Sequence, residues 1–373
     1  MRSSRAGWAR AAGLVAFAAV VAAACGGGRA ATPTPTAQGV AASAQGVRFV
    51  ADGDSVYGTL QLPAMRTGAK VPAALILAGS GPTDRDGNSK LLAGKTDTLK
   101  AFAQALAADG VASLRYDKLG TGETGLGSYA SHPNDIGFNG YVDEAIAAYR
   151  FLAARPEVDP QRMLILGHSE GALIAMVAAN KLESGGPSAL VLAAPPGRGY
   201  LETIQGQITA QFQAAVAGGQ ASKSRADAAL ATLARVVESL KTSGTYPAGV
   251  AIDDPALKAI FTPGNERFLA QAEQHDPAKE AAHLPATMPI LILHGDKDQQ
   301  VSAGDISLLV EALRASGHQH VDVSTLPNAD HVFKDVPGTP NPASDYTNAS
   351  LPFSPGAIAA LRTFVRTALS VPG

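Results

Sequence analysis

The stretch Leu164-Ile165-Leu166-Gly167-His168-Ser169-Glu170-Gly171-Ala172-Leu173 predicts a buried strand, a tight turn at a serine and the start of a helix. This order of strand, G-x-S-x-G turn and helix is that of a nucleophile elbow. Glycines are expected beside the serine because the backbones of strand and helix come too close for a side chain. We therefore expect Ser169 to be a nucleophile. The alternative is a serine that only caps the helix.

Outward from this turn, apolar strands alternate with helices along most of the chain. This pattern predicts an α/β fold whose mostly parallel central sheet carries helices on both faces. The expected strands are 47–51, 56–62, 71–77, 111–116, 162–166, 189–193, 290–294 and 320–326, and the expected helices are 91–108, 142–154, 172–181, 306–316 and 357–369. Residues 197–285 contain helical runs without a convincing strand, which predicts a helical cap inserted between residues 46–196 and 286–373 of the core.

The first 24 residues have the composition of a signal peptide, in which basic residues precede an apolar run at 11–24. That run is too short for a transmembrane helix. The only cysteine, Cys25, follows three alanines and so resembles the lipidated cysteine of a bacterial lipoprotein. Residues 25–45 predict a flexible tether. We expect an exported protein, lipid-anchored on the outer face of the cell membrane or in the periplasm; ordinary secretion after cleavage at the alanines is the alternative.

Length, charge and residue spacing indicate a large globular domain and give no sign of a nucleic-acid-binding or metal-binding protein. A chain of 373 residues with 46% apolar content is long enough for one large α/β domain with an insertion. Removal of residues 1–24 would change the formal charge from −2 to about −5, and no basic stripe is present, so nucleic acid is not an expected partner. The histidines have no metal-like spacing with acidic residues, and we expect neither a metal nor another cofactor.

The residues that could activate Ser169 follow two later strands. A serine hydroxyl needs a histidine to accept its proton and an acid to orient that histidine. Asp296 and Asp298 follow the strand at 290–294, and His331 follows the strand at 320–326. The chain order Ser, Asp, His is that of α/β-hydrolases, and either aspartate could be the acid. Alternatively, His331 is a surface histidine.

From about residue 47 onward, the chain resembles the α/β-hydrolase fold, and in particular bacterial serine esterases and the related serine aminopeptidase-like group. The matching motifs are Gly-Ser-Gly-Pro-Thr-Asp-Arg-Asp-Gly-Asn at 79–88, Arg-Tyr-Asp-Lys at 115–118, the elbow at 167–171 and residues 295–301. The family pattern G-x-x-D-x-x-V falls on the last of these motifs. The resemblance therefore implies that Asp298 is the acid and His331 the base.

Acyl transfer also requires hydrogen-bond donors for an oxyanion. The elbow supplies the backbone N–H of Glu170 at the start of its helix. We expect the second donor in the glycine-rich loop after the strand at 71–77, from Ser80 and next from Gly81; the alternative is a simple turn. The neighbouring residues 84–86 (Asp-Arg-Asp) either brace this loop by ion pairs or are solvated.

We expect a carboxylesterase that cleaves short acyl esters through an acyl-enzyme on Ser169, because the acidic residues of the cap are spread along its helical faces and form no cluster that could bind a substrate ammonium. An aminopeptidase or amidase with the same three residues, or an inactive binding relative, remains an alternative. Apolar positions in the cap could line an acyl pocket or pack against the core; they are Ile204, Ile208, Phe212, Leu230, Leu233, Val237 and Leu240. We expect no membrane contact other than the lipid anchor, and no feature of the sequence indicates an oligomeric state.

Overall fold

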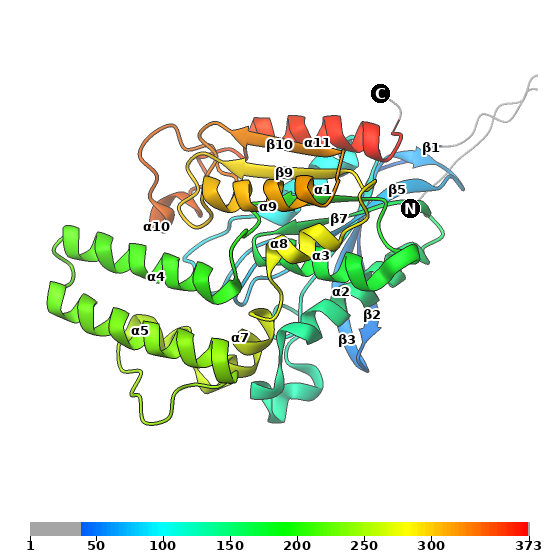
Figure 1. The fold of residues 1–373 in the computed structure, drawn as a ribbon. Coiled ribbons are helices and arrows are strands. Elements are labelled where there is room, and N and C mark those ends of the chain that lie inside the picture. Colours follow the sequence, from blue (N-terminus) through cyan, green and yellow to red (C-terminus); the bar gives the residue numbers. More distant parts are fainter. Residues whose placement is uncertain (1–38, 372–373) are drawn as a thin grey trace, which may run out of the picture. The chain divides into compact units, whose positions relative to one another are not determined.

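Eight strands form the central sheet of the computed structural model, which describes residues 39–371 (Figure 1). The strand order is β10-β9-β8-β7-β5-β6-β3-β2. Neighbours from β10 to β6 are parallel, whereas β3 is antiparallel to both β6 and β2. The strands are β2 (Ser43–Ala51), β3 (Asp54–Leu62), β5 (Val71–Leu77), β6 (Ala112–Tyr116), β7 (Val158–His168), β8 (Ala189–Ala193), β9 (Ile290–Gly295) and β10 (Val321–Leu326), and a separate short pair is formed by β1 (Gly39–Val40) and β4 (Met65–Arg66).

Helices cover both faces of the sheet. Helices α1 (Thr98–Ala108) and α11 (Pro355–Ala368) bury apolar side chains against one face. The other face carries α2 (Phe138–Ala153), α3 (Glu170–Leu182), α8 (Pro277–His283) and α9 (Ala303–Ala315). This arrangement is the one that the alternation of strands and helices predicts.

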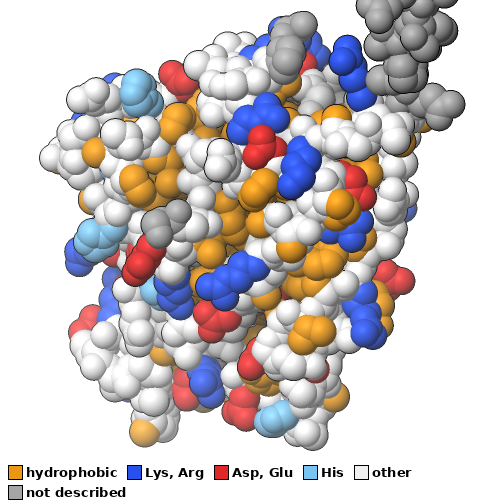
Figure 2. Space-filling view, turned by 90° about the vertical axis from the view of Figure 1, so that its right-hand side faces the viewer, with side chains coloured by type: hydrophobic (Ala, Val, Ile, Leu, Met, Phe, Trp, Pro, Cys, Tyr) orange, Lys and Arg blue, Asp and Glu red, His pale blue; other side chains and the backbone are white. Residues whose placement is uncertain are grey.

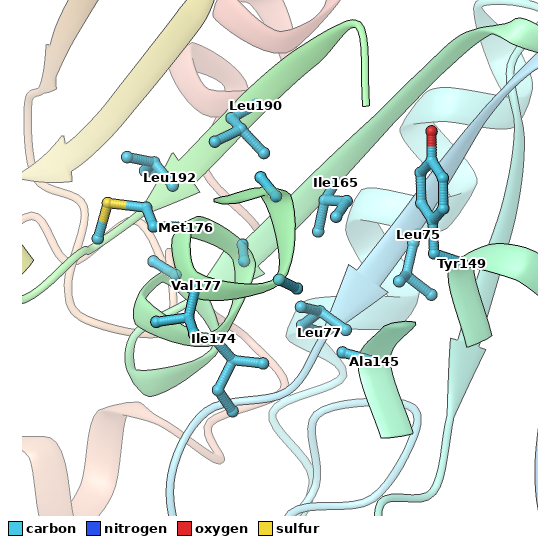
Figure 3. Packing of buried hydrophobic residues seen from close by; sticks show 14 of the residues in the cluster. Leu75, Leu77, Ala145, Tyr149, Ile165, Ile174, Met176, Val177, Leu190 and Leu192 are labelled. Atoms are coloured by element: carbon cyan, nitrogen blue, oxygen red, sulfur yellow. The ribbon is translucent and has the colours of Figure 1, made fainter. Parts of the chain in front are cut away.

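The continuous apolar sequence of β5 follows from this double coverage. Successive strand residues point to opposite faces, so Leu75 and Leu77 pack towards α2 and α3 while Ala74 and Ile76 pack towards α1. Figure 3 shows Leu75 and Leu77 with Ile165 from β7, all directed at the same helical layer. The side chains on both faces of β5 are thus shielded from solvent.

Local signals fix where several helices begin. Helix α9 starts with a capping box, in which the Ser302 side chain accepts from the Asp305 N–H and the Asp305 side chain accepts from the Ser302 N–H. Helix α11 starts with the Ser354 side chain as its cap and Pro355 at the first helical position. Both caps satisfy N–H groups that have no partner within the helix.

The expected cap region consists of helices between β8 and β9. Four of them, α4 (Tyr200–Ala217), α5 (Lys223–Ser243), α6 (Pro255–Lys258) and α7 (Glu266–Ala272), share an apolar cluster of their own. Helix α8 differs from the expectation, because its Ala281 is buried in the core cluster that contains α3 and α9. The segment expected to be cap up to residue 285 therefore ends in a helix of the core. The short helices are α10 (Pro342–Asp345), η1 (Gly127–Ser131), η2 (Pro133–Asp135), η3 (Glu183–Gly185) and η4 (Pro263–Asn265).

The first helix of the core is shorter than expected. A helix is predicted over 91–108, but α1 begins at Thr98. The Asn88 side chain accepts hydrogen bonds from the N–H groups of Thr96 and Asp97, which ties these residues into the preceding loop. Asp97 also has a left-handed backbone with φ of 51°, so the helix cannot extend back through it.

The folded part of the chain begins earlier than expected. Residues 25–45 are predicted to form a tether, but residues 39–45 include β1 and the start of β2, where Ser43 pairs with Leu62. Their small and polar side chains are mostly exposed, so the ladder is held by backbone hydrogen bonds that leave no apolar pattern. The expected signal peptide, Cys25 and the tether residues before 39 lie outside the described residues.

The surface carries both signs of charge. On the face that Figure 2 shows, basic and acidic side chains are interspersed among apolar and uncharged ones. Within residues 39–371, no helix combines the length and the apolar character needed to cross a membrane. The same residues contain no group of three or more His, Cys, Asp or Glu side chains arranged to hold a metal ion.

Candidate active site

The turn between β7 and α3 holds Ser169 in a strained conformation, with φ of 55° and ψ of −123°. Glycine is required on both sides of the serine because neighbouring backbone comes very close to positions 167 and 171. A Cβ on Gly167 would lie 2.1 Å from the Gly171 carbonyl oxygen, and a Cβ on Gly171 would lie 2.6 Å from the Leu77 carbonyl oxygen. A side chain on Gly167 would push α3 away from β7, and one on Gly171 would push α3 away from the end of β5.

The structure brings His331 and Asp298 to this serine. His331 Nε2 lies 3.0 Å from Ser169 Oγ, and His331 Nδ1 lies 2.8 Å from Asp298 Oδ2. The side chain of Asp298 is fully buried and that of His331 is 5% exposed. The three residues follow the ends of β7, β9 and β10 in the parallel part of the sheet, where β9 and β10 are neighbours and β8 lies between β7 and β9. The arrangement can pass a proton from Ser169 to His331.

The environment of Asp298 keeps its carboxylate charged. Burial alone would raise its pKa, but the charge of His331, its hydrogen bond, and the N–H groups of Val301 and Gln300 together hold the pKa below the usual value. Those two N–H groups donate to Oδ1 at 3.0 and 2.7 Å. Oδ2 remains for His331, which fixes the tautomer with a proton on Nδ1.

Asp296, the other expected candidate for the acid, has a different partner. Its Oδ1 accepts a hydrogen bond from the Asn328 N–H at 2.7 Å. Asn328 has φ of 60° and lies in the turn that leads from β10 to His331. Asp296 therefore braces the backbone near the histidine instead of contacting its ring.

His168, which precedes the serine, contacts both the backbone carbonyl and the ring of His331. Its Nε2 lies 2.8 Å from the His331 carbonyl oxygen, and the two ring centroids are 5.0 Å apart. Burial, and then the charge of His331, lower the pKa of His168 to about 4. A neutral His168 carries a proton on Nε2 and donates it to the His331 carbonyl, since an unprotonated nitrogen could not bond to a carbonyl oxygen.

The loop after β5 lies against the serine. A Cβ on Gly79 would lie 3.2 Å from Ser169 Cβ, so no larger residue fits there without displacement. Within the described residues, the N–H groups of Ser80, Gly81 and Glu170 have no hydrogen-bond partner. These are the donors that the sequence predicts for an oxyanion, and all three residues line one cavity.

Ion pairs brace this loop, which was one of two alternatives for residues 84–86. Arg85 Nη2 lies 2.6 Å from Asp117 Oδ2, and the Arg85 N–H donates to Asp117 Oδ1 at 2.8 Å. Asp86 binds Arg115 Nε at 2.7 Å. The loop is thus fastened to the end of β6, and Arg85 is occupied by Asp117 and Glu123.

A buried polar cluster beside the loop was not assigned a role from the sequence. Lys118 Nζ donates to the Gly79 carbonyl at 2.7 Å and lies 3.3 Å from Glu170 Oε1. Glu170 Oε2 accepts from the Tyr200 hydroxyl at 2.5 Å. In the sequence, only the Arg-Tyr-Asp-Lys motif could have pointed to Lys118. Tyr200 belongs to the cap, and no sequence spacing connects it with Lys118 or Glu170.

A cavity of about 530 Å³ opens next to this cluster. The loops of the core contribute Ser80, Gly81 and Lys118, and the cap contributes Tyr200 and residues further along α4 and α7. Its apolar lining is Pro82, Leu91, Leu119, Leu126, Pro133, Ile136, Tyr141, Tyr200, Ile204, Ala259, Ile260, Phe268 and Leu269. Of the cap positions expected to line a pocket or to pack, only Ile204 lines this cavity; the others lie in or against the apolar cluster of the cap.

Comparison with known proteins identifies one family. The sequence model described as serine aminopeptidase, S33, matches residues 92–333, which include Ser169, Asp298 and His331. Among curated proteins, no match is found.

Solved structures with the same fold have low sequence identity to this chain. A puromycin hydrolase gives a TM-score of 0.53 at 15% identity, over 89% of this chain and 40% of its own. Est1E from Butyrivibrio proteoclasticus gives a TM-score of 0.51 at 16% identity, and the match covers 87% of this chain and 99% of Est1E. An esterase of Pyrococcus furiosus gives a TM-score of 0.50 at 15% identity, and the match covers 78% of this chain and 83% of the esterase. These likenesses confirm the expected α/β-hydrolase fold.

Proposed function

The chain belongs to the serine aminopeptidase S33 family of serine hydrolases, and on that premise we propose that it is a carboxylesterase for short acyl esters. One observation carries the proposal. Ser169, His331 and Asp298 form a continuous hydrogen-bonded series beside an apolar cavity. The series supplies the nucleophile with its base and orienting acid, and the cavity supplies space for an acyl chain.

The proposed reaction has two halves. His331 Nε2 accepts the Ser169 proton as Oγ attacks the acyl carbon, and Asp298 stabilises the resulting imidazolium. The tetrahedral intermediate collapses, the carbon–oxygen bond to the alcohol breaks, and His331 returns its proton to the leaving alkoxide. A water molecule then attacks the acyl-enzyme with His331 again as base, which releases the carboxylic acid and restores the Ser169 hydroxyl.

The negative charge of each tetrahedral intermediate needs donors that are already in place. The N–H groups of Ser80 and Glu170, which have no hydrogen-bond partner within residues 39–371, are suited to this role together with that of Gly81. Glu170 is the first residue of α3, so its N–H lies at the positive end of the helix dipole.

The lining of the cavity favours esters over aminoacyl amides. Recognition of a substrate ammonium requires a carboxylate that is free to accept it in a partly desolvated pocket. Among the described lining residues, the only carboxylate is Glu170, which already binds Lys118 and Tyr200. A volume of about 530 Å³ suits acyl chains of roughly two to eight carbons.

The first experiment compares p-nitrophenyl esters of two to eight carbons with aminoacyl p-nitroanilides. We expect kcat/KM for the best ester to exceed that for the best anilide by at least about 100-fold, because an uncompensated ammonium in this cavity costs several kcal/mol. If the anilides are the better substrates, the chain is an aminopeptidase or amidase with the same three residues.

A second experiment tests the nucleophile. Ser169→Ala should lower ester kcat/KM by at least about 10³-fold with an unchanged melting temperature, because loss of one member of a triad removes most nucleophilic catalysis. A fluorophosphonate probe should label wild-type protein at Ser169 and leave the variant unlabelled. Ser307→Ala, on the exposed side of α9, is the matched control. A wild-type protein that neither turns over substrate nor reacts with the probe would be the inactive binding relative.

We also propose that the enzyme is exported and anchored through a lipid on Cys25. The support is the sequence pattern at residues 1–25, which lie outside the described part of the chain. The same pattern without lipidation would give a secreted enzyme.

A further inference from the structure

Lys118 is a buried cation at the edge of the candidate oxyanion site. Its side chain is 8% exposed, and Nζ contacts two groups that belong to the two sides of that site. On one side is the carbonyl of Gly79, at 2.7 Å. On the other is the carboxylate of Glu170, at 3.3 Å.

The bond to Gly79 fixes the direction of the next N–H. In a trans peptide, the carbonyl of one residue and the N–H of the following residue point in opposite directions. Anchoring the Gly79 carbonyl on Lys118 therefore turns the Ser80 N–H away from Lys118. A hydrogen bond to the carbonyl also polarises the same amide, which makes its N–H a stronger donor.

The bond to Glu170 ties the second donor to the first. Glu170 contributes its backbone N–H to the candidate oxyanion site and its side chain to Lys118. The free carboxylate oxygen accepts from the Tyr200 hydroxyl, which belongs to the first cap helix. Burial, and then the charge of Glu170, raise the pKa of Tyr200, so the hydroxyl keeps its proton and remains a donor.

The position of Lys118 itself is secured by helix α2. Nζ lies 5.1 Å from the centroid of the Tyr141 ring, in a cation–π contact. The Tyr141 hydroxyl donates to the Leu119 carbonyl at 3.3 Å, and the Leu119 N–H donates to Glu144 at 3.0 Å. The residue after Lys118 is thus held at both of its backbone polar groups.

We propose that Lys118 is a positioning residue that sets the geometry of the oxyanion site through the Gly79 carbonyl and the Glu170 carboxylate. The inference rests on the proposed function of Ser169. Lys118 does not touch the reacting atoms; it orients the peptide that does. Through Tyr200, the same contacts connect this site to the cap.

The test replaces Lys118 by methionine, which has a similar length and no charge. Because an oxyanion site acts in the transition state, Lys118→Met should lower kcat by about 10- to 100-fold while KM changes by less than about threefold. The inhibition constant of a trifluoromethyl ketone analogue of the best substrate should rise by the same factor as kcat falls, since that adduct mimics the tetrahedral intermediate. Inhibition by the carboxylic acid product should stay within about threefold.

A second variant covers the case in which Glu170, left without its cation, destabilises the fold. Lys118→Met combined with Glu170→Gln keeps the site neutral and preserves the Glu170 backbone N–H, and it should show the same pattern. Lys181→Met is the matched control, because Lys181 forms an exposed ion pair at the other end of α3. Its kinetics should match those of the wild type.

Three results would overturn the inference: a kcat within about threefold of wild type in both Lys118 variants, a loss that lies in KM alone, or a fall in kcat without weaker binding of the trifluoromethyl ketone. Each of these requires a wild-type protein that reacts with the fluorophosphonate probe and turns over substrate. A wild-type protein that does neither overturns the proposed function, and the inference with it.

Discussion

At the scale of single residues, two aspartates separated by one position have different tasks. Asp298 directs one oxygen to His331 and accepts two backbone N–H groups with the other. Asp296 accepts one N–H from Asn328. The family pattern on residues 295–301 singles out Asp298, and the contacts with His331 agree with that choice.

The two aspartates should therefore respond differently to the same substitution. Asp298→Asn should lower ester kcat by at least about 10³-fold, because an amide stabilises the wrong tautomer of His331. Asp296→Asn is the matched control and should lower kcat by less than about tenfold, since an amide oxygen can still accept from Asn328. Steady-state kinetics of both variants give the ranking, and the opposite ranking would move the orienting role to Asp296.

At the scale of elements, helix α2 presents a buried carboxyl group to the loop after β6. Glu144 accepts the Leu119 N–H and is 5% exposed. Burial, and then the charges of Asp117 and Asp54, raise the pKa of Glu144 to about 8, against the opposing effects of the Leu119 N–H and Lys118. Glu144 is therefore mostly protonated at neutral pH.

This raised pKa gives the wild type a stability that depends on pH. The folded state holds the Glu144 proton more tightly than the unfolded state, so the stabilisation is complete below pH 4.5 and is lost as the pH rises through about 8. Glu144→Gln has no proton to lose. We expect the melting temperature of the wild type, relative to Glu144→Gln, to fall between pH 5 and pH 9. The exposed Glu311→Gln serves as the control, and a constant difference across that range would contradict the assignment.

At the scale of the whole folded unit, the segment that leads from the core into the cap, at residues 197–198, is held in place by Asp305 of α9. Asp305 accepts hydrogen bonds from Arg198 Nε and Nη2 at 2.9 and 3.0 Å. A Cβ on Gly197 would lie 2.0 Å from the Asp305 carbonyl oxygen, so only glycine fits there without displacement. Burial would raise the pKa of Asp305, but Arg198 and Ser302 hold it at about 2. One buried carboxylate thus caps α9 and anchors the start of the cap.

The proposed lipid anchor predicts where the enzyme is found in a cell. Cys25→Ser should move the protein from the membrane fraction to the soluble fraction, because the lipid chains supply the membrane affinity. Its kcat/KM should remain within about twofold of wild type, since Cys25 is none of the residues proposed to act in the reaction. Fractionation followed by an ester assay measures both, and an unchanged distribution would favour plain secretion or another attachment.

The sequence alone determined the features that depend on local chemistry. The apolar strands and the glycines at 167 and 171 could be predicted because strand periodicity and turn sterics act between near neighbours, whereas the resemblance to a known family singled out Asp298 and His331. Parallel strands place their carboxyl ends along one edge, so residues that follow different strands were expected to meet. The alternation of strands and helices predicted the α/β class, and the resemblance of the motifs implied the α/β-hydrolase fold that is confirmed.

Only the tertiary structure decided which groups surround these residues. Lys118 and Glu170 are 52 positions apart, and Glu170 and Tyr200 are 30 positions apart, yet they share one buried cluster. The start of α1 depends on the side chain of Asn88, and the start of the folded part depends on backbone pairing of β2 with β3. Side chains that meet across the sheet and the cap leave no periodic signal, because their spacing along the chain is set by the lengths of the elements between them.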